Sequence, residues 1–506
     1  MDKGLTSAIA ANRFGLGARP GELATIGGSG PDWLRAQLDG PAPEIAGNGL
    51  QSSASILAQI YDLRRTIRTE RLSATADGTD GGAGVPGSSG TTGSVAASPA
   101  AAGSAAAGSA TADSSAAAAA IGAFKKQGQL IRPIYVAEAT ARFRESVATD
   151  RPFVERLTHF WANHFAVSVD KAMLAGLAGS YEREAIRPYV LGNFIDMLLA
   201  TERHPAMLLY LDNQISMGPD SRAAQNIARR KPDRRIGINE NLARETMELH
   251  TVGVDGGYTQ TDVTAFSEVL TGWSIAGPDG WRTGAQPGTF LFRAGMHQPG
   301  SDVVMGKRYP DTGYDQGVAV LRDLARRPAT ARFIATKLAR HFIADDPPAP
   351  AVDRMAAAFS ESGGDLPTVY RALIASPEAW QQPVAKFKTP SDFIVSSFRG
   401  LELPVREDKA PVGLFQLLGQ RIWAPGSPAG WPDRSADWDG ASGLLKRIEW
   451  ADAVGQRVGS RRDAMDLAPQ MLGSVLSAAT HEAIAHAESA SQAIALLLAS
   501  PEFMRR

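Results

Sequence analysis

Hydrophobic positions recur at helical spacing in two successive segments of the chain, residues 239–250 and 259–273. A glycine-containing turn at 253–257 separates these two segments. The second segment opens with Thr259 and, three residues on, Asp262, which is the pattern of a capping box. Its large apolar residues then fall on one face, which predicts that this face is buried: Val263, Phe266, Leu270 and Trp273.

Helical periodicity also extends through most of the remaining chain and is clearest in its last third. Two strand candidates, at 289–293 and 301–306, together suggest a short β-hairpin excursion near 289–306. The pattern therefore predicts a mainly α fold, with residues 1–506 forming one large multi-helical domain. A division into two helical subdomains near Asp311 is the alternative.

Residues 72–121 differ in kind from the segments on either side of them. They are almost entirely Gly, Ala, Ser and Thr, so they lack the large apolar side chains that would offset the entropy lost on ordering. We expect a disordered, low-complexity insertion between two helices of one domain. A linker between domains is the alternative, although the residues before it would make a thin core alone.

Composition excludes several classes of function. The chain of 506 residues has a formal net charge of −1, which argues against a general nucleic-acid binder. It contains no Cys, so disulfides, thiolate metal sites, iron–sulfur clusters and cysteine nucleophiles are excluded. No apolar run is long enough for a membrane span, and residues 1–15 lack the pattern of a secretory signal, which indicates a cytoplasmic protein.

Candidate chemistry gathers on the first of the two predicted helices. At helical spacing Glu245 and Glu248 share a face, and His250 closes the last turn. Two carboxylates so placed can hold a hard divalent metal or divide the roles of acid and base. The structural alternative is a ladder of ion pairs through Glu240, Arg244 and Glu248.

Two further residues complete the candidate catalytic set. His159 lies beside Glu155 and Asn163 on another predicted helix, where a surface position and a role in the site are both open. His164 is interpreted as a hydrogen-bonded core histidine, since it lies on the apolar stripe of that helix. The candidate catalytic residues are therefore Glu245, Glu248, His250, His159 and Asp262.

A basic segment at 219–236 comes just before the first predicted helix. It holds six Arg or Lys residues against two Asp residues and reads as an irregular loop. Such a loop attracts anions, which makes it a candidate substrate-binding element, and a solvated loop without a ligand is the alternative. The candidate residues are Arg229, Arg230, Arg234 and Arg235.

Several familiar catalytic motifs are absent from the sequence. It has no P-loop, no G-x-G-x-x-G after a strand, no H-E-x-x-H and no G-x-S-x-G. Nucleotide-dependent, zincin and serine-hydrolase functions therefore lose their simplest support.

Longer segments carry a resemblance that covers nearly the whole chain. They are NRFGLGARPGEL (12–23), HFWANHFAVSVDK (159–171), NENLARETMELHTVGVDGGYTQTDV with LTGW (239–273), ATARFIATKLARHFIADDPP (329–348) and SPAGWPD (427–433). In these segments the chain resembles the bacterial family called domain of unknown function 1800. That family usually has the sequence His-Asp-x-Gly where this chain has His297 and Gln298. This difference weakens the case for a functional His–Asp pair at that position.

The resemblance also implies a context. Members of the family often look exported and are often encoded beside a sulfatase-like family, domain of unknown function 1501, so a sulfatase-like partner and export with it are implied. Two functions are therefore expected. One is a hydrolase-like or other acid–base enzyme for an anionic substrate, with a divalent metal as candidate cofactor. The other is a non-catalytic scaffold for an exported sulfatase-like protein.

Overall fold

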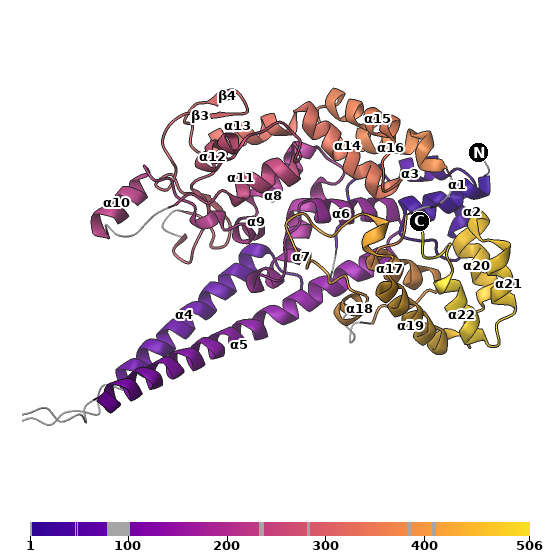
Figure 1. Ribbon diagram of the computed structural model, residues 1–506, viewed down its shortest axis with the longest axis horizontal. Helices are drawn as coiled ribbons and strands as arrows, with labels where there is room; N and C mark the ends of the chain where they lie inside the picture. The colour runs from indigo at the N-terminus through magenta and orange to yellow at the C-terminus, as the bar shows by residue number, and fades with distance from the viewer. Residues whose placement is uncertain are drawn as a thin grey trace, which may run out of the picture.

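The computed structural model describes residues 3–45, 47, 49–77, 102–231, 237–280, 284–381, 384, 386–406 and 411–506. Over these residues the chain is built from helices and two small antiparallel hairpins (Figure 1). The predicted mainly α fold is thus confirmed. None of the described helices combines the length and the apolar run that crossing a membrane requires.

The first half of the chain folds into the helices α1 to α12. They are α1 (Lys3–Ile9), α2 (Glu22–Ile26), α3 (Gly30–Ala36), α4 (Ser53–Asp77), α5 (Ala102–Ala148), α6 (Pro152–His164), α7 (Ala178–Tyr181), α8 (Phe194–Arg203), α9 (Pro205–Tyr210), α10 (Arg222–Arg230), α11 (Asn241–Glu245) and α12 (Gln260–Val269). Helix α6 starts with Pro152 in its first turn and buries Phe153, Leu157 and Trp161 completely, so it forms part of the core on several sides.

The second half of the chain adds the helices α13 to α22. They are α13 (Tyr314–Ala325), α14 (Pro328–Phe342), α15 (Ala349–Glu361), α16 (Leu366–Ala375), α17 (Pro390–Gly400), α18 (Val412–Leu417), α19 (Ala441–Val458), α20 (Ala464–Leu472), α21 (Ala478–Ala485) and α22 (Ala490–Ala499). Buried hydrophobic residues form two clusters. The first extends along the chain as far as Trp380, and the second combines residues from Phe387 onward with Leu16, Ala139 and Phe143 from the first half. The single-domain organisation and the alternative division near Asp311 both stay predictions.

Helices α4 and α5 pack against each other and project from the rest of the molecule (Figure 1). They occupy the two ends of the predicted insertion, because α4 continues to Asp77 and α5 starts at Ala102. Residues 78–101, between these ends, lie outside the described residues.

Both predicted strands are present, but they do not pair with each other. Strand β2 (Phe290–Phe292) pairs with β1 (Trp273–Ile275), and β3 (Asp302–Val304) pairs with β4 (Lys307–Tyr309). Helix α12 ends at Val269, so Trp273 opens a strand instead of closing the helix. The predicted single hairpin is therefore wrong in its pairing, because each strand finds its partner in a segment that had no clear strand pattern.

Candidate functional site

The helix predicted to carry the carboxylates changes geometry at its centre. Residues 241–245 form α11, and Thr246 to His250 continue it as a π-helical turn. A π turn holds more residues than an α turn, so side chains three residues apart are rotated differently. The face predicted from α-helical spacing therefore does not extend unchanged to His250.

Glu245 and Glu248 are both half-buried on this element. Burial raises the pKa of Glu245, and the neighbouring Glu248 acts in the same direction while His250 opposes it. Glu248 accepts a long hydrogen bond from the Tyr258 hydroxyl, at 3.5 Å. Within the described residues neither carboxylate is ion-paired with an arginine, since Arg244 instead pairs with Glu240 at 2.8 Å.

His250 is buried and has a different carboxylate partner from the expected one. Its Nδ1 lies 2.7 Å from Oε1 of Glu202, which comes from α8, and both side chains are almost completely buried. Its backbone oxygen accepts a hydrogen bond from Nε2 of His164, so the predicted core role of His164 is confirmed. His250 thus joins α8 to α6 inside the core.

Asp262 serves the helix terminus. It completes the predicted capping box with Thr259, whose backbone N–H donates to its carboxylate at 2.8 Å. Its second oxygen accepts from the backbone N–H of Met305 at 2.5 Å. Burial acts to raise the pKa of Asp262, but these hydrogen bonds outweigh burial and lower it.

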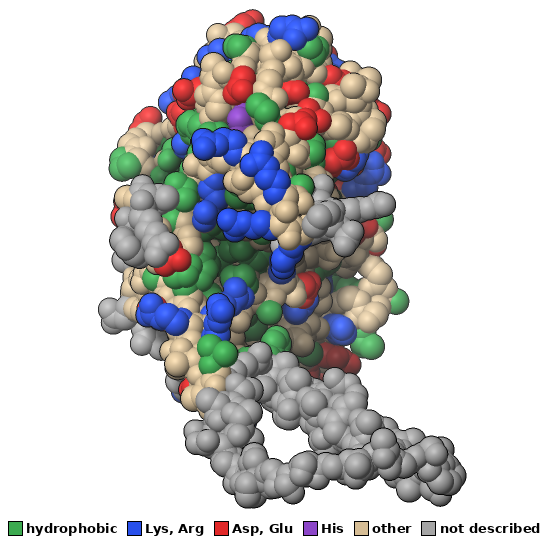
Figure 2. Space-filling model, turned by 90° about the vertical axis from the view of Figure 1, so that its left-hand side faces the viewer, with side chains coloured by type: hydrophobic (Ala, Val, Ile, Leu, Met, Phe, Trp, Pro, Cys, Tyr) green, Lys and Arg blue, Asp and Glu red, His purple; other side chains and the backbone are tan. Residues whose placement is uncertain are grey.

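The predicted basic loop is partly helical. Residues 222–230 form α10, which Ser221 caps by accepting from the backbone N–H of Ala224. Arg229 and Arg230 are exposed at its end, whereas Arg234 and Arg235 lie outside the described residues. Figure 2 shows the face on which α10 lies, where Lys and Arg side chains gather around a hollow lined by hydrophobic side chains.

No metal site emerges from the predicted residues. Over the part of the chain that the structure describes, no group of three or more His, Asp or Glu side chains is placed to hold a metal ion. The geometry therefore lends no support to the divalent metal expected as a cofactor.

Replacing Glu245 by Gln should leave the melting temperature at pH 7 unchanged or slightly higher. Burial raises the pKa of Glu245, so ionising it disfavours the folded state, and a neutral amide removes that penalty. As the pH falls and the carboxyl of Glu245 is protonated, the melting temperature of the parent should rise relative to that of the variant. Asp255→Asn, at an exposed position, is the control; a clear drop in melting temperature for Glu245→Gln would instead mean that a cation balances Glu245.

A cavity of about 100 Å³ lies elsewhere, between α6, α14, the start of α17 and the loop 424–433. Its lining includes His159 and Asn163 from α6 and His341 from α14. Asn163 holds the loop in place, since its side chain accepts from the backbone N–H of Trp431 and donates to the carbonyl of the same residue. Three of the segments that carry the family resemblance, 159–171, 329–348 and 427–433, therefore meet at this cavity.

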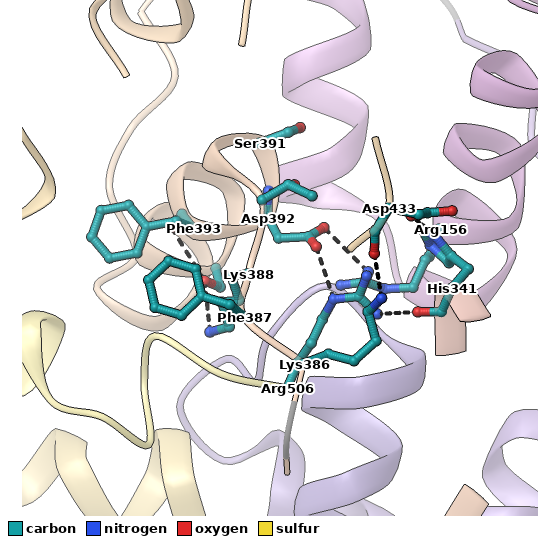
Figure 3. A network of polar contacts seen from close by, with 12 residues as sticks. Arg156, His341, Lys386, Phe387, Lys388, Ser391, Asp392, Phe393, Asp433 and Arg506 are labelled. Carbon is teal, nitrogen blue, oxygen red and sulfur yellow. Dashed lines mark hydrogen bonds and ion pairs between the residues drawn. The ribbon is translucent and has the colours of Figure 1, made fainter. Parts of the chain in front are cut away.

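His341 and Asp433 form an oriented pair in the cavity wall (Figure 3). Nδ1 of His341 lies 2.9 Å from Oδ1 of Asp433. Burial lowers the pKa of His341 to about 4, against the opposing effect of Asp433, so the imidazole is neutral at pH 7. Nδ1 then carries the proton donated to Asp433. Nε2 is buried, has no hydrogen-bond partner within the described residues and keeps its lone pair.

Ion pairs hold this wall together, and one of their members, Asp392, lines the cavity itself. Asp392, at the start of α17, lies 3.2 Å from Nη1 of Arg156 and 2.9 Å from Nε of Arg506, the last residue (Figure 3). Burial acts to raise the pKa of Asp392, but the two guanidinium groups outweigh it and hold that pKa far below its usual range. Lys386 donates to the carbonyl of Asp433 and pairs with Asp345. The loop, α6, α17 and the C-terminus are thereby fixed to one another.

Comparison with known families matches residues 9–505 to DUF1800, whose description is a protein of unknown function. The chain belongs to the DUF1800 family. No curated protein matches it, and no solved structure does either. Since the family's description assigns no activity, the function of this DUF1800 protein has to be argued from its own geometry.

His159 is the one predicted catalytic residue that lines the cavity of this DUF1800 protein. Its Nε2 lies 3.2 Å from Glu155 and 3.1 Å from the Ser146 hydroxyl. Burial and the nearby Arg142 lower its pKa, although Glu155 acts in the opposite direction. Glu155 is also engaged by both terminal nitrogens of Arg187, at 2.6 and 2.7 Å. The structure thus brings His159 together with His341 and not with the predicted carboxylates.

A second cavity, of about 250 Å³, adjoins the first and shares the loop segment Trp431 to Asp433 with it. Lys337, Arg340 and Arg434 line it, against the carboxylates of Asp433 and Asp437. Positive charge is therefore in excess around the loop, and a cavity lined in this way attracts anions.

Sequence reasoning missed His341, Asp433 and Asp392. His341 and Asp433 lie inside two segments that carry the family resemblance, 329–348 and 427–433, which was the available signal. Spacing along the chain could not join them, because these segments are far apart in sequence and meet only through the fold.

Proposed function

We propose that this DUF1800 protein is an acid–base enzyme of the hydrolase type that acts on a small anionic substrate, with His341 as its general base. One observation carries the proposal: a neutral imidazole in a cavity wall, oriented by a carboxylate, whose Nε2 has no hydrogen-bond partner within the described residues. A base held in its reactive tautomer by a second group is the arrangement that general-base catalysis requires.

The chemistry follows from the two nitrogens of His341. Nε2 takes a proton from a water molecule as the water oxygen forms a bond to the electrophilic centre of the substrate. The resulting imidazolium is stabilised by Asp433, which accepts the Nδ1–H hydrogen bond. Nε2 then returns the proton to the leaving group, so the base is regenerated at the end of each cycle.

Charge around the cavity supports an anionic substrate. Arg142 and Arg421 line the cavity itself, where the carboxylates of Asp392 and Asp433 balance their charge. The positive excess comes from the neighbouring cavity, which is lined by Lys337, Arg340 and Arg434. Arg421 is partly exposed and paired with Asp170 at the surface, so its guanidinium can exchange that partner for a substrate anion. The basic segment at α10 was the predicted anion site, but it lies at the far end of the molecule from α17 (Figure 1).

His341→Asn should abolish turnover while keeping the fold. The asparagine amide can still donate to Asp433, but no atom replaces Nε2, so the rate should fall by about 10²–10⁴-fold, the usual contribution of a general base. The measurement is nitrophenolate release from a panel of nitrophenyl carboxylate, phosphate and sulfate esters, alongside the melting temperature. His481→Asn, at an exposed position on α21, is the control.

The second candidate function is the non-catalytic scaffold of a sulfatase-like exported protein. It is favoured by the pairing of Asp392 and Asp345 with Arg and Lys side chains, since ion-pair networks that join distant segments are often purely structural. The sulfatase-like partner, and export with it in place of a cytoplasmic location, rest on the family resemblance. A parent that turns over no ester, together with a His341→Asn variant that loses stability, would favour the scaffold.

A further inference from the structure

A separate cavity of about 380 Å³ lies at the first turn of α19, beside α18. Its lining includes the run Gly440 to Gly443, together with Lys446 and Arg447. Pro390 lines this cavity, whereas the next residues, Ser391 and Asp392, line the cavity of His341. The two cavities are therefore neighbours at the start of α17, with different residues lining each.

The first turn of α19 offers free backbone donors to this cavity. The helix is 18 residues long, and Gly440 caps it without a side-chain hydrogen bond. The first amide to bond back to the cap is that of Leu444, which donates to the carbonyl of Gly440 at 3.0 Å. The amides of residues 441–443 precede it, and no acidic residue stands in the first turn, so the partial positive charge of the helix end is uncompensated there.

Arg447 supplies the second, independent observation. Its side chain is 1% exposed, yet neither Nη1 nor Nη2 has a hydrogen-bond partner within the described residues. The guanidinium lies over the ring of Phe387, 4.4 Å from its centre, and that contact occupies a face and leaves the in-plane N–H groups free. Burying a cation whose N–H groups have no acceptor costs free energy, unless an anion accepts their hydrogen bonds.

We propose that this cavity binds a phosphate group, either free or as a monoester, between the guanidinium of Arg447 and the first-turn amides of α19. A planar guanidinium fork matches two phosphate oxygens, and a helix N-terminus accepts the remaining charge. Lys446 and Arg447 outweigh Asp437, which lines the same cavity, so the side chains there carry a net positive charge. The site is independent of His341 and of the reaction proposed for it.

The test is calorimetric titration of the full-length protein with inorganic phosphate and, separately, with phenyl phosphate, at constant ionic strength. Saturable binding of at least one is expected, and the comparison distinguishes the free ion from a monoester. Arg447→Met fills a similar volume without the donors, and Ser442→Asp places a negative charge at the exposed first turn. Each should weaken binding by at least about tenfold, since hydrogen bonds to charged groups are involved.

Three controls keep the result interpretable. Arg457→Met removes a charge from the exposed end of the same helix and should leave binding unchanged, as should His341→Asn. Without phosphate, Arg447→Met should melt close to the parent, because it removes both the cost of a buried cation without hydrogen-bond acceptors and the contact of that cation with Phe387. The proposal is overturned by a parent that binds neither probe at about 10 mM, well above the millimolar affinity of a weak site, or by equal binding in the parent and both site variants.

Discussion

Replacing Asp392 by Ala should lower the free energy of unfolding by about 3–5 kcal/mol, the usual result of removing one partner from a buried ion pair. The carboxylate of Asp392 lies between Arg156 and Arg506, whose side chains are 2% and 1% exposed. Both guanidinium groups would remain buried and lose their shared counter-charge. Urea unfolding at pH 7, followed by circular dichroism, measures the difference.

The pH dependence provides a second measurement of the same pair. The folded protein holds the pKa of Asp392 far below its usual range, so its stabilising effect is fully present above the unfolded pKa of about 3.9 and is lost as the pH falls below that value. The stability difference between the parent and Asp392→Asn should therefore be constant from about pH 5 to 8 and shrink in stronger acid. A difference that persists undiminished at pH 3 would mean that the loss comes from packing and not from charge.

An exposed ion pair is the matched control. Asp353 pairs with Arg332 at 2.8 Å, but both side chains are more than half exposed. Solvent screening makes such pairs weak, so Asp353→Asn should change the free energy of unfolding by less than about 1 kcal/mol. If the variants at positions 353 and 392 lowered the free energy of unfolding equally, burial would not be the reason why the ion pairs of Asp392 stabilise the fold.

Local features of the fold could be predicted because neighbouring residues determine them. The capping box of Thr259 and Asp262 and the buried face of Val263 and Phe266 follow from spacing alone, and the structure has both. The strands near 290 and 303 were also recognisable. Their partners were not, because the turn that closes β3 on β4 is made by Met305 and Gly306, both at positive φ, where Met gives no turn signal.

The candidate site was less predictable because its contacts join segments far apart in the chain. His250 was recognised as chemically interesting, but its carboxylate partner, Glu202, comes from α8 and not from its own helix. The π-helical turn before His250 also alters the helical spacing on which the predicted face depended. His341 and Asp433 lie 92 residues apart, so only the fold reveals that they form a pair.

Trp273→Ala should also lower the free energy of unfolding by about 3–5 kcal/mol, the usual result of removing a buried aromatic side chain. The predicted burial of this residue is confirmed, since its side chain is 0% exposed although it stands on β1 and not on α12. The ring lies 5.4 Å from that of Phe290 and 5.5 Å from that of Tyr314. Trp273→Phe should lower the free energy of unfolding much less, because the indole Nε1 has no hydrogen-bond partner within the described residues and no hydrogen bond is lost.

The same indole explains a glycine inside α13. A methyl group on Gly317 would lie 2.7 Å from Cζ2 of Trp273, so Gly317→Ala should destabilise the protein by about 1–3 kcal/mol through overpacking. In the Trp273→Phe background the smaller ring leaves room, and the same substitution should be less harmful, which a double-mutant cycle measures as a coupling. Gly413→Ala, where a methyl group meets open space on α18, should instead be neutral or stabilising. Additive effects at positions 273 and 317 would show that the ring does not exclude the methyl group.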